Sequence, residues 1–187
     1  MSLTTGSNVT CIGYNAQPSS ATVSDEITLG NSSIGTLRCN TATISTLSDA
    51  RDKKNIRDLN LGIGFLMKVK PRLFRWDRRE WYENKFADGS KMQESPTAGF
   101  IAQELDEVQM GEHAEWLKLV LKDNPDRLEA TPGNLLPIIV KAVQDVKQEK
   151  DEEIAKLKAN IDELKAMVKA LAAEKKGVGD KSLGEVK

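Results

Sequence analysis

Ser48 and Lys53 lie five positions apart in the segment of residues 48–56. A serine hydroxyl beside a lysine amine is a minimal pair of nucleophile and base. Five residues along a continuous helix turn through about 500°, so the two side chains would point about 140° apart. They meet only if Ser48 precedes the first helical residue, and Asp49 is a residue type that caps such a start. The segment therefore predicts either a Ser/Lys nucleophile or a plain helix start.

The charges around the lysine act in opposite directions. A free lysine amine has a pKa near ~10.4 and becomes a base near neutral pH only through burial or nearby cations. Arg51 and Lys54 favour the neutral amine. Asp49 and Asp52 favour the ammonium instead. The local charges do not decide between a catalytic pair and a helix cap.

The composition of the chain changes abruptly at this segment. Residues 1–47 are rich in Ser, Thr, Asn and Gly and hold only three charged residues, Asp25, Glu26 and Arg38. Small apolar clusters alternate there with turn formers, a pattern typical of short strands. So few apolar side chains cannot stabilise a lone segment of this length. We expect either disorder or, as the strand pattern favours, the tip of an intertwined β-stem that borrows its core from other chains.

Residues 49–134 hold all three tryptophans and all four phenylalanines, so a core can form here. Apolar residues from Ile56 to Met67 recur at near-helical spacing and predict a helix that begins near Asp49 and ends at Pro71. The other elements expected are two short strands and then two helical patches, at residues 73–76, 97–102, 105–108 and 116–121. The pattern indicates a small α+β domain.

The chain from Leu135 onward has a helical pattern, with Pro137 in the first turn. Apolar residues then recur in steps of three and four and form an a/d seam over three heptads: Ile154, Leu157, Ile161, Leu164, Val168 and Leu171. A narrow seam with charged flanks favours a coiled coil over a helix packed on a globular core. Ile or Val at a and Leu at d favour dimers in parallel coils. Gly177 and Gly179 are expected to end the helix.

The chain thus divides into a stem tip at residues 1–48, an α+β domain at 49–134, a coiled-coil helix at 135–176 and a flexible tail at 177–187. Its formal net charge is −1, which provides no long-range attraction to nucleic acid or to an anionic membrane. Basic and aromatic residues mix over positions 68–79, but a solvated strand face explains them better than nucleic-acid binding. No apolar run of about 18 residues and no signal sequence is present, so we expect a cytosolic chain without a membrane partner.

The sequence contains few residues that could bind a metal ion or a cofactor. Cys11 and Cys39 lack CxxC spacing, and His113 is the only histidine. These ligands are too few for a structural zinc site. We expect half-buried free thiols, no metal and no cofactor.

Four segments, in this order and spacing, resemble the intramolecular chaperone auto-processing domain at the C-termini of phage endosialidases, tailspikes and long tail fibres. They are Ser-Asp-Ala-Arg-Asp-Lys-Lys-Asn-Ile at residues 48–56, Leu-Phe-Arg-Trp at 73–76, Gly-Phe-Ile-Ala-Gln-Glu-Leu at 99–105, and residues 128–136 before the C-terminal helix. The resemblance covers residues 48 to about 171.

The resemblance implies an intertwined homotrimer that folds the fibre stem preceding it and then cuts itself off. Ser48 would be the nucleophile, Lys53 the base, and Ser48–Asp49 the bond that breaks. The stem ending at Ser48 would stay on the virion, and the chaperone beginning at Asp49 would be released in the host cytoplasm. The implied trimer overrides the dimer suggested by the heptads.

Three further residues are candidates for supporting this site: Arg51, Gln103 and Glu104.

Attack by Ser48 on its own carbonyl closes a four-membered ring, whereas attack on the Leu47 carbonyl closes a five-membered ring. A hydroxyl from a neighbouring chain would remove this difficulty. The alternative function is a structural trimerisation module without cleavage, in which Ser48 and Asp49 only cap a helix.

Overall fold

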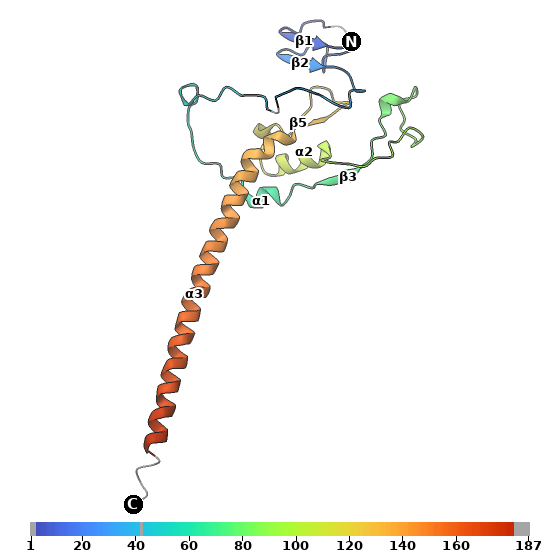
Figure 1. Cartoon of the computed structure of the whole chain (residues 1–187). Coiled ribbons are helices and arrows are strands. Elements are labelled where there is room, and N and C mark those ends of the chain that lie inside the picture. Colours follow the sequence, from blue (N-terminus) through green and yellow to red (C-terminus); the bar gives the residue numbers. More distant parts are fainter. Residues whose placement is uncertain (1–2, 42, 182–187) are drawn as a thin grey trace, which may run out of the picture.

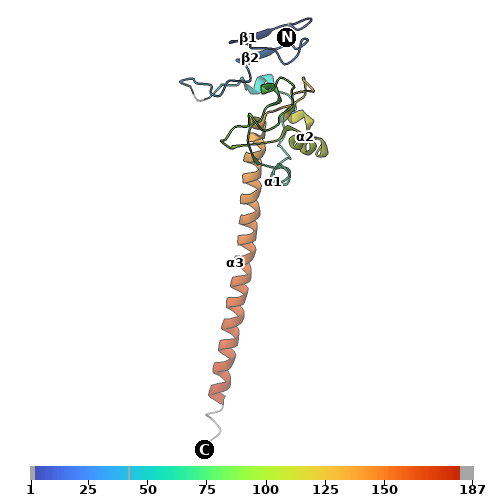
Figure 2. The ribbon, with the colours of Figure 1, turned by 90° about the vertical axis from the view of Figure 1, so that its right-hand side faces the viewer.

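The computed structural model describes residues 3–41 and 43–181. These residues form an α+β fold with small two-stranded sheets and one long C-terminal helix, α3, Leu136–Lys181 (Figure 1). Figure 2 shows that α3 projects from the rest of the chain as a rod, with the first two strands at the opposite end of the molecule. The α+β class and the long helix predicted from the sequence are confirmed.

The N-terminal sheet pairs β1, Val9–Ile12, with β2, Glu26–Leu29, in parallel. Residues 17 positions apart lie opposite each other, and the same offset continues beyond the strands. Thr4 N donates to Ala21 O at 2.8 Å, and Asn8 Nδ2 donates to Asp25 Oδ1 at 2.7 Å. The stem tip is therefore a β-coil with a period of 17 residues, which the apolar pattern alone did not indicate.

Left-handed backbone at matching positions makes the corners of this coil. Asn8 and Asp25 have φ angles of 55° and 61°, and Gly13 and Gly30 have φ angles of 121° and 75°. Asparagine, aspartate and glycine tolerate this conformation better than other residues. Leu47 stands 17 residues after Gly30, so the sequence does not supply a third glycine corner. Apart from residue 42, which is not described, residues 32–49 form no helix or strand.

The central domain is built from short elements. In chain order they are 3-10 turn Ala50–Asp52, α1 Ile63–Leu66, β3 Arg72–Phe74, 3-10 turn Arg79–Trp81, β4 Thr97–Gly99, α2 Ala102–Gly111, 3-10 turn Glu115–Leu117, β5 Val120–Leu121, β6 Glu129–Ala130 and 3-10 turn Pro132–Leu135. β3 pairs with β4, and β5 pairs with β6, both antiparallel. The domain therefore depends on its tertiary core more than on long elements.

That core joins α1, α2 and the first turns of α3. Its most buried large side chains are Leu105, Leu119, Leu135 and Ile138, each at most 2% exposed. The buried Gln109 of α2 accepts a hydrogen bond from Leu119 N at 3.0 Å and so satisfies a backbone donor beside β5. Asp145 of α3 accepts from Ile63 N at 3.3 Å, which fixes α1 against the long helix.

Two of the predicted helices are wrong. The helix expected from Asp49 to Pro71 is only a 3-10 turn and the four-residue α1, because Asn55 has a left-handed φ of 52° and the chain then runs without helix to Ile63. The helix expected at residues 116–121 is a 3-10 turn followed by β5. Lys118, at φ 50°, ends that turn and directs the chain into the strand.

Other predictions need smaller corrections. β3 ends before Trp76, and Ala102 begins α2 instead of ending a strand. Helix α3 continues through Gly177 and Gly179 to Lys181, so these glycines do not end it. The expected tail at 177–187 lies partly in this helix, and residues 182–187 are outside the described residues. Cys11 and Cys39 are free thiols but exposed, because the stem tip covers neither of them.

Across the part of the chain that the structure describes, no helix has both the length and the apolar character needed to cross a bilayer. Within residues 3–41 and 43–181, histidine, cysteine and acidic side chains form no cluster of three or more that would hold a metal ion.

Candidate active site

Ser48 and Lys53 meet in the structure. Lys53 Nζ lies 2.5 Å from Ser48 Oγ and 3.2 Å from the Ser48 carbonyl oxygen. The 3-10 turn Ala50–Asp52 brings them together, since Lys53 N bonds back to Ala50 O at 3.1 Å and the chain reverses between them. As the helical geometry required, the serine precedes the turn. The Lys53 amine thus contacts both the Ser48 hydroxyl and the carbonyl oxygen of the peptide bond between Ser48 and Asp49.

Asp49, not Ser48, caps this turn. Its Oδ1 accepts a hydrogen bond from Arg51 N at 2.8 Å, and its two oxygens also accept from Arg51 Nε at 3.0 and 3.1 Å. Hydrogen bonds from the Arg51 side chain and then its backbone hold the pKa of Asp49 below its usual value. Arg51 thus engages the aspartate that would otherwise favour the lysine ammonium. The cap requires nothing from the Ser48 hydroxyl.

The pair lies on the surface of a single copy of the chain. Ser48 and Lys53 are both exposed, and the preceding Leu47 is 101% exposed. Lys53 Nζ is the donor of the hydrogen bond to Ser48 Oγ. To serve as a base, a lysine amine needs burial or nearby cations that favour its neutral form.

Gln103 and Glu104 lie on α2 and make no hydrogen bond to Ser48 or Lys53 among the described residues. Gln103 is exposed. Glu104 pairs with Arg72 of β3, whose Nε donates to it at 2.8 Å. This hydrogen bond lowers the pKa of Glu104 and raises that of Arg72. In one copy of the chain, Glu104 therefore links α2 to β3. Of the three supporting candidates, only Arg51 lies at the pair.

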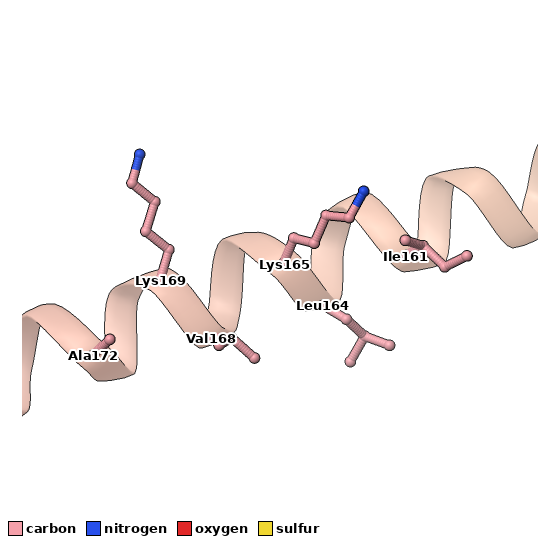
Figure 3. Close-up of a pocket in the computed structure, with 6 residues that line it drawn as sticks. All are labelled: Ile161, Leu164, Lys165, Val168, Lys169 and Ala172. Carbon is pink, nitrogen blue, oxygen red and sulfur yellow. The ribbon is translucent and has the colours of Figure 1, made fainter.

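The predicted heptad seam lies on an uncovered face of α3. Figure 3 shows Leu164 and Val168 projecting away from the side on which Lys165 and Lys169 lie. Leu164 is 59% exposed and Val168 65% exposed. Together with Ile161, Ala172 and both lysine stems, they line a shallow apolar hollow. Within the described residues this stripe has no partner, as expected of a helix surface that another copy covers.

A contact between the stem tip and the central domain was not expected from the sequence. Asn124 Nδ2 donates to Ser19 O at 3.4 Å, across 105 residues of chain. The local sequence Asn124-Pro-Asp126 is typical of a turn, but no sequence pattern pairs it with the stem. The domain therefore touches the segment that joins β1 to β2.

Comparison with known families identifies one match. The family model described as chaperone of endosialidase matches residues 48–114, and the name of that family also classes it as a peptidase. Searches of curated proteins and of solved structures gave no match. The matched segment begins at Ser48, includes Lys53 and ends after α2. The resemblance inferred from the sequence is thus confirmed for its first three segments: residues 48–114 match the chaperone-of-endosialidase family, and the fourth segment, residues 128–136, lies beyond the match.

Proposed function

We propose that this chain is the C-terminal intramolecular chaperone of a phage tail fibre or tailspike, which trimerises, folds the β-rich stem before it and cuts itself off between Ser48 and Asp49. The observation that carries this proposal is the contact of Lys53 Nζ with Ser48 Oγ at 2.5 Å, at the first residue of the family match. The stem would remain on the virion, and the fragment from Asp49 would be released in the host cytoplasm.

The contacts of the lysine favour cleavage after Ser48. A neutral amine has one lone pair and two hydrogens. With its lone pair toward Ser48 Oγ–H it acts as the base. With one hydrogen toward the Ser48 carbonyl oxygen, 3.2 Å away, it polarises the bond to Asp49. The Leu47 carbonyl receives no such contact among the described residues, which argues against cleavage before the serine.

The attacking hydroxyl and the attacked carbonyl belong to different copies in this mechanism, because attack within Ser48 closes a four-membered ring. Lys53 takes the hydroxyl proton, and Oγ bonds to the Ser48 carbonyl carbon of a neighbouring copy. The carbon–nitrogen bond to Asp49 then breaks, and the nitrogen receives the proton from Lys53. Water hydrolyses the ester and leaves a carboxylate on Ser48. Association of the copies also buries the lysine, which favours its neutral form.

The assembly on which this mechanism depends is a homotrimer with α3 as a coiled coil. Its support is the exposed stripe of α3 from Ile154, 47% exposed, to Leu171, 63% exposed. Stem residues Ile27 and Ile44 are 71% and 94% exposed and would be covered in the same assembly. Exposed apolar surfaces of this kind usually mark a place where another chain binds.

Cleavage has a physical reason in folding. A stem made of non-local strand pairs folds slowly, and its unpaired edges invite aggregation. A coiled coil and a domain at the C-terminus hold the chains together and raise the effective concentration of their stems. Cutting afterwards removes the folding aid, so the stem is left kinetically trapped.

The alternative is a trimerisation module that does not cut. The exposure of Ser48 and Lys53 in a single copy favours it, since neither residue is desolvated there. The capping arrangement argues against it. Asp49 already caps the turn through Arg51 N, so a plain cap gives no role to the bond between Lys53 and Ser48.

Replacing the lysine distinguishes the two functions. In Lys53→Ala and Ser48→Ala chains, we expect cleavage during expression to fall below detection on a denaturing gel. Arg57→Ala is the matched control, because it removes an exposed cation of the same segment that makes no hydrogen bond to Ser48 in the described residues. It should cut like the parent chain. Equal cleavage in Lys53→Ala and Arg57→Ala chains would remove Lys53 from the mechanism.

A further inference from the structure

The contact between the central domain and the stem tip involves a pre-formed loop. Asn124 Oδ1 accepts from Asp126 N at 3.0 Å, and Arg127 N donates to Asn124 O at 3.0 Å. Arg79 Nη2 holds the loop from the other side by donating to Asp126 O at 2.5 Å. The loop of residues 124–127 therefore keeps its shape through its own hydrogen bonds, and the Asn124 amide group remains available to the stem.

The stem side of the contact exists only when the stem is folded. Glu26, the first residue of β2, accepts hydrogen bonds from Ser19 N at 2.9 Å and Thr28 Oγ1 at 2.8 Å. The first of these bonds folds residues 19–26 back on themselves and holds Ser19, whose carbonyl accepts from Asn124. An extended stem would separate the Ser19 carbonyl from the Glu26 carboxylate.

Charge complements this geometry. Glu26 is half-buried and carries one of the few charges of the stem tip, and Arg127 of the loop lies close enough to interact with it electrostatically. Burial raises the pKa of Glu26, but hydrogen bonds from Ser19 and Thr28 and the charge of Arg127 outweigh burial and lower it. Arg127 also pairs with Glu129 at 3.1 Å, which keeps the guanidinium at the loop.

We propose that the loop of residues 124–127 is the docking surface by which the chaperone domain recognises the folded last coil of its stem, through the Ser19 carbonyl and the Glu26 carboxylate. This inference rests on the proposed chaperone function and names the part of the client that is bound. The loop lies beyond the family match, which ends at residue 114. Because the contact does not depend on the Ser48–Asp49 bond, it also holds the cut fragments together until it dissociates.

The test is hydrogen exchange of residues 19–30 in the full chain carrying Ser48→Ala, so that no cut complicates the measurement. Arg127→Ala should speed exchange there by about twofold to fivefold, the range of a partly exposed charge pair. Asn124→Asp keeps the oxygen that accepts from Asp126 N but loses the donor to Ser19, so it should act in the same direction. Arg75→Ala, which removes another exposed arginine of the same domain, should leave exchange unchanged.

A second comparison tests the partner. In a chain that already carries Glu26→Gln, adding Arg127→Ala should not increase the exchange rate of residues 19–30 any further. Parent-like exchange in both the Arg127→Ala and Asn124→Asp chains would overturn the proposal, and so would an Arg127→Ala effect that is undiminished by Glu26→Gln. Because the measurement uses an uncut chain, it does not depend on cleavage. A wild-type chain that never cuts would contradict the proposed function and leave this result standing.

Discussion

The stem tip and helix α3 both leave apolar side chains exposed to water, but they differ in how their backbones pair. The stem tip pairs residues that are distant in sequence, whereas α3 pairs near neighbours. In the stem, strand pairing places residues 17 apart opposite each other, and Ile27 is 71% exposed. In α3 each backbone hydrogen bond joins neighbouring turns, and Leu164 is 59% exposed. Local contacts form faster than distant ones. We therefore expect the helices to associate first and to hold the stems together while their coils form.

Disrupting the apolar stripe of α3 should have the largest effect. Leu164→Asp places a charge in the apolar stripe and should cost on the order of 3 kcal/mol or more in each copy if the stripe is covered by other copies. Light scattering should then find monomers, and cleavage should stop. Ala166→Asp is the control, since Ala166 is exposed and lies two residues after Leu164, about 200° further around the helix. An unchanged molar mass in the Leu164→Asp chain would exclude the coiled coil.

Disrupting a corner of the 17-residue coil in the stem tip should have a smaller and more local effect. Gly30→Ala forces an alanine to a φ of 75°, and its Cβ would meet the Ile34 side chain. This should destabilise the coil by about 1–3 kcal/mol. Gly35→Ala is the matched control, because Gly35 has open space around it and no positive φ. Proteolysis of residues 1–48 should accelerate only in the Gly30→Ala chain. Equal proteolysis of both variants would contradict the coil.

The smallest expected effect is that of pH on the stem. The pKa of Glu26 is lowered in the folded chain, so its carboxylate stabilises the coil above the usual glutamate pKa. That stabilisation is lost as the pH falls through the lowered value. Hydrogen exchange of residues 19–30, corrected for the intrinsic effect of pH, should report the loss. In the Glu26→Gln chain this loss should be absent, and an equal loss there would assign the effect to another group.

The sequence predicted the features that depend on neighbouring residues. Asp49 caps a turn, Ser48 precedes it, and Pro137 sits in the first turn of α3, all as the local rules require. The length of the first helix was not predictable in this way. Its apolar spacing was helical, but the left-handed Asn55 and the packing of Phe65 into the core reduce it to α1.

Features that depend on distant residues were not predictable from the sequence. The 17-residue coil repeats its corner residues more closely than its apolar ones: Gly13 matches Gly30, whereas Val9 faces Glu26. The loop of residues 124–127 meets Ser19 across 105 positions, and nothing in either segment alone points to the other. The Ser48–Lys53 pair was predictable as a contact, but both residues are exposed in a single copy of the chain.

The most direct test of the central claim is the intact mass of the wild-type chain under denaturing conditions, after its trimeric state has been verified. We predict two fragments, one that ends with a free carboxylate on Ser48 and one that begins at Asp49. A fragment ending at Leu47 would move the attack to the preceding carbonyl. A single mass for the whole chain, in a sample that is trimeric, would contradict self-cleavage and leave Ser48 and Lys53 as part of a structural turn.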